Sequence, residues 1–167
     1  HIDKWNYGPK PAHLIRYVAE KCKTTRQALN AFAKLPACVP KNYLIADAKG
    51  DVAAVEHAAK TYAVVRPGED GVLIQTNHIL APDLQRFDRI LKDNPTTTSF
   101  LRYAEADHLI ARQLPGFQFT DLWRILRDSH YVYNDEVIWS LALELTSGRY
   151  NIYYDTAMGQ KHQKFSF

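Results

Sequence analysis

The chain has 167 residues, of which 46% are hydrophobic and 23% charged, so we expect a single domain with a buried core over residues 1–167. Its 21 basic residues are interspersed with 18 acidic ones, without the clustered Lys and Arg that mark nucleic-acid-binding proteins. No run of 18 apolar residues occurs, so the sequence predicts no membrane span.

Two amphipathic helices are predicted at the start. Pro9 and Pro11 suit the first turn of a helix. Its apolar stripe has helical spacing and consists of Leu14, Ile15, Val18, Ala19 and Cys22. Thr24 and Gln27 have the spacing of a capping box, which predicts that a second helix starts there and ends before Pro36.

Three β-hairpins are predicted where apolar segments flank turn clusters of Asp, Gly, Pro or Ser. The paired segments are 43–46 with 52–55, 62–65 with 72–76, and 137–145 with 150–154. Residues 164–167 are predicted to form a closing strand. Short turns between neighbouring strands favour antiparallel pairing.

Three further helices are predicted between the second and third hairpins. One spans residues 84–91, while Ser99 and Thr120 are each placed to cap another. Helices grouped apart from antiparallel strands indicate an α+β fold with helical layers.

Sequence motifs for several kinds of chemistry are missing. Neither Gly-x-Ser-x-Gly nor His-Glu-x-x-His occurs, and the histidines form no metal-ligand pair. Cys22 and Cys38 lack the close spacing of zinc ligands and are predicted to be buried thiols. We therefore expect neither a metal nor a cofactor.

Two residues are candidates for chemistry, and each has a simpler interpretation. Asn77 follows the apolar segment 72–75, where its side-chain N–H could stabilise an oxyanion or could only cap a strand. Arg102 would lie in the first turn of a helix capped by Ser99, where it could pair with a carboxylate, polarise a thiol or simply be solvated. The residues alone leave these alternatives open.

Several segments, taken in order, resemble one family. They are residues 43–56, Thr76-Asn77-His78, Ser99-x-x-Arg102-Tyr103, residues 137–140 and residues 164–167. In order and spacing they are similar to the C-terminal half of the linear-amide C–N hydrolases. That group includes the acyl-coenzyme A:6-aminopenicillanate acyltransferases, with choloylglycine hydrolases as more distant relatives.

The resemblance implies a fold, a mechanism and a site. The fold would be part of an αββα sandwich of the N-terminal-nucleophile hydrolases. A cysteine freed by self-cleavage would attack an amide carbonyl and form a thioester. Asn77 would help to form the oxyanion hole, and Arg102 would support the surroundings of the nucleophile. His78 and Tyr43 are predicted to bind the substrate.

The family's catalytic cysteine has no counterpart in this sequence. The first residue is His1, and neither Cys22 nor Cys38 lies in a suitable context. We therefore expect the C-terminal portion of a larger domain, inactive alone, whose partner is an N-terminal segment or subunit that carries the cysteine. Its other partner would be a small-molecule amide or acyl donor. The alternative is a non-catalytic truncated relative that binds a ligand or a partner chain.

Overall fold

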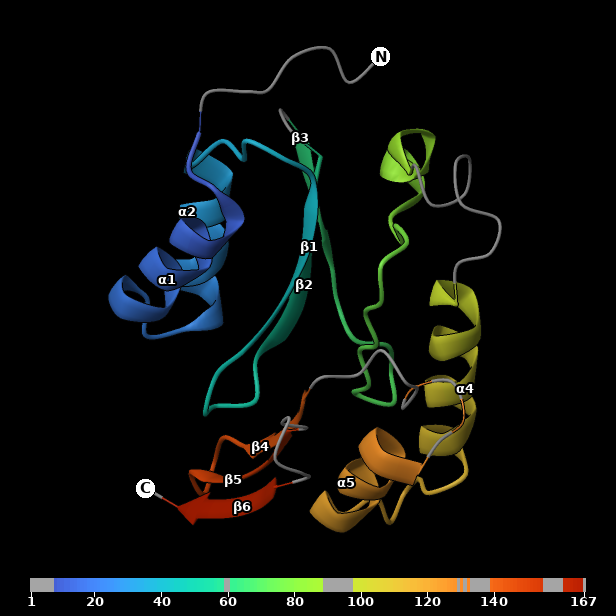
Figure 1. The fold of residues 1–167 in the computed structure, drawn as a ribbon. Coiled ribbons are helices and arrows are strands. Elements are labelled where there is room, and N and C mark those ends of the chain that lie inside the picture. The colour runs from blue at the N-terminus through green and yellow to red at the C-terminus, as the bar shows by residue number, and fades with distance from the viewer. Residues whose placement is uncertain are drawn as a thin grey trace. The chain divides into compact units, whose positions relative to one another are not determined.

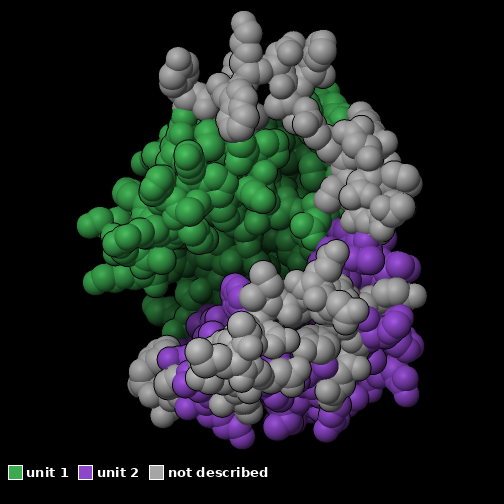
Figure 2. Space-filling model, viewed as in Figure 1, with its two compact units in different colours: residues 1–97 green, residues 98–167 purple. Residues whose placement is uncertain are grey.

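The computed structural model describes residues 8–58, 61–88, 98–128, 130, 132, 139–154 and 161–166, as helices and two three-stranded antiparallel sheets (Figure 1). One sheet belongs to unit 1, residues 1–97, and the other to unit 2, residues 98–167 (Figure 2). The predicted α+β class is confirmed. That both units form one domain stays a prediction.

Unit 1 begins with the two predicted helices, α1 (Pro11–Lys21) and α2 (Thr25–Lys34). The Thr24 hydroxyl accepts a hydrogen bond from the backbone N–H of Gln27 at 3.2 Å, as predicted for the cap. The Gln27 side chain accepts from the backbone N–H of Lys23 at 2.7 Å, not from that of Thr24 as in a standard capping box. The two side chains thus accept hydrogen bonds from backbone N–H groups at, and just before, the start of α2.

The sheet of unit 1 consists of β1 (Lys41–Ala46), β2 (Val52–Ala58) and β3 (Thr61–Val65), in that order. The first predicted hairpin is confirmed as β1 and β2. The second is wrong, because β3 pairs with β2 and residues 72–76 form no strand. Val72, the first residue of this segment, bonds back into the preceding turn instead: its N–H donates to the Asp70 carboxylate at 3.0 Å, and its carbonyl accepts from the N–H of Gly68 at 3.4 Å.

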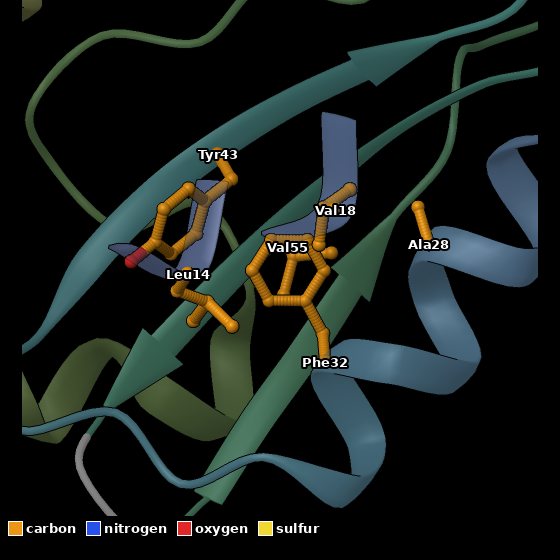
Figure 3. Close-up of a cluster of buried hydrophobic side chains, with 6 residues drawn as sticks. All are labelled: Leu14, Val18, Ala28, Phe32, Tyr43 and Val55. Atoms are coloured by element: carbon orange, nitrogen blue, oxygen red, sulfur yellow. The ribbon is translucent and has the colours of Figure 1, made fainter. Parts of the chain in front are cut away.

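Helices α1 and α2 cover one face of this sheet (Figure 1). The buried side chains between them come from both helices and from β1 and β2 (Figure 3): Leu14, Val18, Ala28, Phe32, Tyr43 and Val55. The Phe32 and Tyr43 ring centroids lie 4.7 Å apart in a tilted arrangement. This cluster is the main apolar core of unit 1.

The opposite face of the sheet packs against the chain that follows β3. A 3-10 helix, η1 (Pro82–Phe87), stands where the sequence predicted a helix over residues 84–91. Residues 89–91 of that prediction lie outside the described residues. A second buried cluster forms here from Ala58, Ala81 and Leu84, with Ala63, Val65, Ile79 and Phe87 packed around it.

Unit 2 contains helices α4 (Ser99–Ala111) and α5 (Phe119–Asp128). The predicted caps are wrong by one or more positions: Thr98 occupies the N-cap position of α4, and Thr120 lies inside α5. None of the helices in the described ranges is long and apolar enough to cross a bilayer.

The start of α5 is set by an acidic side chain. The Asp121 carboxylate accepts a hydrogen bond from the backbone N–H of Gln118 at 2.8 Å. This bond satisfies an N–H that precedes Phe119, so the helix begins before Thr120.

The sheet of unit 2 is formed by β4 (Trp139–Glu144), β5 (Arg149–Tyr154) and β6 (Lys161–Ser166), in that order. The third predicted hairpin is confirmed as β4 and β5, and the closing strand as part of β6. Residues 137, 138 and 167 of these predictions lie outside the described residues. Helix α5 packs on β4, where the Ser140 hydroxyl donates to the carbonyl of Leu126 at 3.3 Å.

Candidate functional site

The Asn77 turn, residues Thr76 to His78, is the candidate site in unit 1. Residues 77 and 78 form a bend in an irregular segment, so Asn77 does not end a strand as predicted. Asn77 is exposed, whereas His78 is only 6% exposed. Within this turn residue 77 is therefore open to solvent and the next residue is buried.

Asn42 on β1 contacts the carbonyl side of this turn. Its Nδ2 donates to the carbonyl oxygens of Thr76, Asn77 and His78 at 3.2, 3.3 and 3.1 Å. An amide NH₂ has two hydrogens, so the three oxygens share two donors. One strand side chain thus holds three successive carbonyl groups.

Glu56 on β2, the register partner of Asn42, contacts the backbone just after the turn. Its carboxylate accepts from the backbone N–H groups of Leu80 at 2.7 Å and Ala81 at 2.8 Å, and from Nε2 of Gln75 at 3.3 Å. Glu56 is 1% exposed. Three N–H donors compensate for the cost of burying this acidic side chain.

Gln75 and Asp88 complete the hydrogen bonds around the turn. Gln75 Nε2 also donates to the carbonyl oxygens of Thr76 at 3.3 Å and His78 at 3.2 Å. The Asp88 carboxylate accepts from the backbone N–H of Ile79 at 2.7 Å. We call Asn42, Glu56, Gln75 and Asp88 the anchoring side chains.

The two residues predicted to bind substrate lie in different surroundings. His78 Nδ1 lies 3.0 Å from the hydroxyl of Thr76, within the turn. Tyr43 lies in the apolar core, 7% exposed, and its hydroxyl makes no hydrogen bond in the described part of the chain. Burial raises the pKa of Tyr43, and the nearby Cys38 adds to this. Both predicted roles stay predictions.

Arg102 lies in unit 2, in the first turn of α4, as the sequence predicted. Its Nε donates to the Thr98 hydroxyl at 3.1 Å, and its backbone N–H donates to the Thr98 carbonyl at 2.8 Å. Two bonds to the same residue fix the start of α4. A catalytic role for Arg102 stays a prediction.

Both cysteines of the chain, Cys22 and Cys38, lie in unit 1. Cys22 packs against the main core of unit 1, and both Cys22 and Cys38 are partly buried thiols outside any disulfide. Within the described ranges, no group of three or more His, Cys, Asp or Glu side chains could hold a metal ion.

The anchoring side chains were missed by reasoning from the sequence. A signal for Glu56 was present, since it is an acidic residue inside the apolar segment 52–58. Acidic residues are almost never fully buried without partners, so such a position predicts a specific set of donors. Which donors they are could not be predicted, because Leu80 and Ala81 lie far along the chain.

The comparisons with known proteins point to one family. Residues 1–143 match the sequence model of the family described as acyl-coenzyme A:6-aminopenicillanic acid acyl-transferase. The matched range includes the Asn77 turn, the anchoring side chains and Arg102. No curated protein and no solved structure matches the chain.

Proposed function

The chain belongs to the acyl-coenzyme A:6-aminopenicillanic acid acyl-transferase family, and on this premise we propose that it is part of an enzyme that acts on linear amide C–N bonds through a cysteine nucleophile. Membership by itself indicates acyl-transfer or hydrolytic chemistry. The nucleophile would lie on an N-terminal segment or subunit and be freed by self-cleavage. The substrate would be a small-molecule amide or acyl donor.

The proposed reaction has two stages. The cysteine thiolate attacks the amide carbonyl carbon, a C–S bond forms, and the carbonyl oxygen becomes an oxyanion. The oxyanion then collapses to the thioester carbonyl, the C–N bond breaks, and the amine leaves with the proton that the thiol lost on forming the thiolate. In the second stage water or another amine attacks the thioester carbonyl, the C–S bond breaks, and the sulfur takes the attacking group's proton and is released as the thiol. Asn77 donates a side-chain N–H to the oxyanion in both stages.

The observation that carries this proposal is the placement of Asn77. It is exposed on a turn whose backbone carbonyls and following N–H groups are held by buried or partly buried side chains. A donor on a held backbone needs little reorganisation when charge develops on the substrate, and preorganisation of this kind is the largest contribution of many oxyanion holes.

Arg102 is proposed to favour the thiolate form of the cysteine. A guanidinium group near a thiol stabilises the thiolate and so lowers the pKa of the thiol. The position of Arg102 in the first turn of α4, bonded to Thr98, gives it a defined starting geometry.

The αββα sandwich is proposed from the family membership, and each unit by itself has a sheet with helices packed on it. In unit 1, α1 and α2 cover one face of β1–β3, and in unit 2, α5 packs on β4. A sandwich of this kind requires helices on the outer face of each sheet.

An Asn77→Ala variant tests the function. The chain is combined with the segment that carries the cysteine, and amide cleavage is followed by release of the amine. We expect kcat to fall about 100- to 1,000-fold with little change in KM, as on loss of one oxyanion donor. Asn30→Ala, the same change at an exposed position of α2, is the matched control and should leave the rate unchanged.

Two outcomes would contradict the proposal. Unchanged kinetics in Asn77→Ala would remove Asn77 from the mechanism. No amide cleavage by the unsubstituted protein together with the cysteine-bearing segment would favour the non-catalytic alternative, a module that binds a ligand or a partner chain.

A further inference from the structure

Asn42 and Glu56 form a chemically complementary pair at the centre of unit 1. They are direct partners in the β1–β2 register, so both side chains lie on the face opposite α1 and α2. Asn42 donates hydrogen bonds through Nδ2, and the two carboxylate oxygens of Glu56 accept them. The pair can therefore bond both kinds of backbone group.

These two side chains bond different backbone groups around Asn77. Asn42 bonds the carbonyl oxygens of residues 76–78, and Glu56 bonds the N–H groups of residues 80 and 81. Residues of the sheet thus restrain both the turn and the backbone that follows it. A backbone held in this way limits the directions in which the Asn77 side chain can project.

A carboxylate suits the position of Glu56 better than any similar side chain. An apolar residue would leave the N–H groups of Leu80 and Ala81 without their acceptor, which is costly in a buried site. A Gln side chain has one acceptor oxygen, and its NH₂ group would face one of the two backbone N–H groups. Only an ionised carboxylate accepts from both and from Gln75 as well.

We propose that Glu56 and Asn42 are positioning residues for Asn77: they fix the turn so that the Asn77 amide meets the oxyanion, an inference that rests on the proposed function. Neither residue touches the reacting atoms. Their effect on the reaction passes through the orientation of Asn77, and a displacement of about 1 Å at such a donor is enough to cost about 100-fold in rate.

Glu56→Gln tests the inference, with Glu69→Gln as its matched control. Glu69 is an exposed acid in the loop after β3, so the same chemical change there should have no effect. In the chain combined with the cysteine-bearing segment, we expect Glu56→Gln to lower kcat about 10- to 100-fold, with KM changed less than about threefold. Asn42→Ala, with Asn30→Ala as control, provides the same test if Glu56→Gln does not fold.

A double-mutant cycle separates positioning from a merely structural role. If Glu56 acts through Asn77, Glu56→Gln should lower kcat less than about twofold once Asn77 is already Ala. An equal loss of kcat in both backgrounds would overturn the inference and leave the proposed function intact. An unaffected Asn77→Ala single variant would instead contradict the proposed function.

Hydrogen exchange gives a readout that does not need activity. At least one of the amides of Leu80 and Ala81, the one that faces the NH₂ group of the new side chain, should exchange at least about tenfold faster in Glu56→Gln, while the amides in the β1–β2 ladder stay protected. Unchanged exchange at both amides would show that Glu56 does not hold the turn, and would overturn the inference whatever the kinetics.

Discussion

The two faces of the sheet in unit 1 are built from alternate residues of the same strands but differ in chemistry. Tyr43 and Val55 face α1 and α2 and join an apolar cluster. Their chain neighbours Asn42 and Glu56 face the other way and hold the Asn77 turn through hydrogen bonds. The strand period of two thus separates residues that stabilise the fold from residues that orient a loop.

The difference teaches what each face controls. Apolar packing is non-directional and scales with the area removed from water, so the helix face supplies stability. Hydrogen bonds depend on distance and angle, so the polar face determines where a particular backbone lies. Substitutions in the cluster on the helix face should therefore lower the free energy of unfolding. On the other face, which also carries the smaller cluster of Ala58, Ala81 and Leu84, substitutions of Asn42 or Glu56 should mainly displace the Asn77 turn.

Phe32→Ala is expected to have the largest effect. The side chain is 1% exposed and packs against Tyr43, so its removal leaves a cavity in the main core. We expect the free energy of unfolding to fall by about 3–5 kcal/mol, measured by urea denaturation. Tyr43→Phe is the control, because it removes only a hydroxyl that has no hydrogen-bond partner among the described residues, and it should change this free energy by less than about 1 kcal/mol. A loss below about 1 kcal/mol in Phe32→Ala would break the assignment of stability to this face.

Asn42→Ala should have a smaller effect on global stability. The variant removes one donor group from carbonyl oxygens of a turn whose central residue is exposed, so water can replace much of the bonding. We expect a loss of about 1 kcal/mol in the same denaturation experiment. A loss as large as that of Phe32→Ala would show that the polar face also carries the stability of unit 1.

The pH dependence linked to His57, on the helix face, is expected to be the smallest effect. Burial lowers the pKa of His57 below its usual 6.5, partly offset by hydrogen bonds to the carbonyls of Leu35 and Phe32. His57 therefore takes up a proton less readily in the folded protein than in the unfolded chain. As a result, the free energy of unfolding decreases as the pH falls below 6.5, where the unfolded chain becomes protonated first.

This effect is measured by comparing unfolding midpoints at several pH values between about 5 and 8, the range in which histidine side chains change charge. His57→Gln should flatten the dependence, whereas the exposed His13→Gln should leave it as it is. A steeper acid dependence in His57→Gln would contradict the sign derived from burial.

The features predicted correctly from the sequence are local ones. The stripe through Leu14 and Val18, the Thr24 cap and the β1–β2 hairpin each depend on residues a few positions apart. Apolar periodicity and turn chemistry decide such elements before the chain has folded. The ordered motifs around Tyr43, Asn77 and Arg102 likewise resembled the family that residues 1–143 match.

The tertiary structure alone decided how the distant parts of unit 1 meet. Residues 72–76 are apolar enough for a strand, yet β3 pairs with β2 instead, and the next turn is bonded by side chains. Glu56 and Leu80 are 24 positions apart, and their bond exists only once the sheet has brought them together. A local sequence pattern cannot predict such a partner. A buried carboxylate needs hydrogen-bond donors, but any donor can serve, and the three-dimensional path of the chain determines which donors lie close enough.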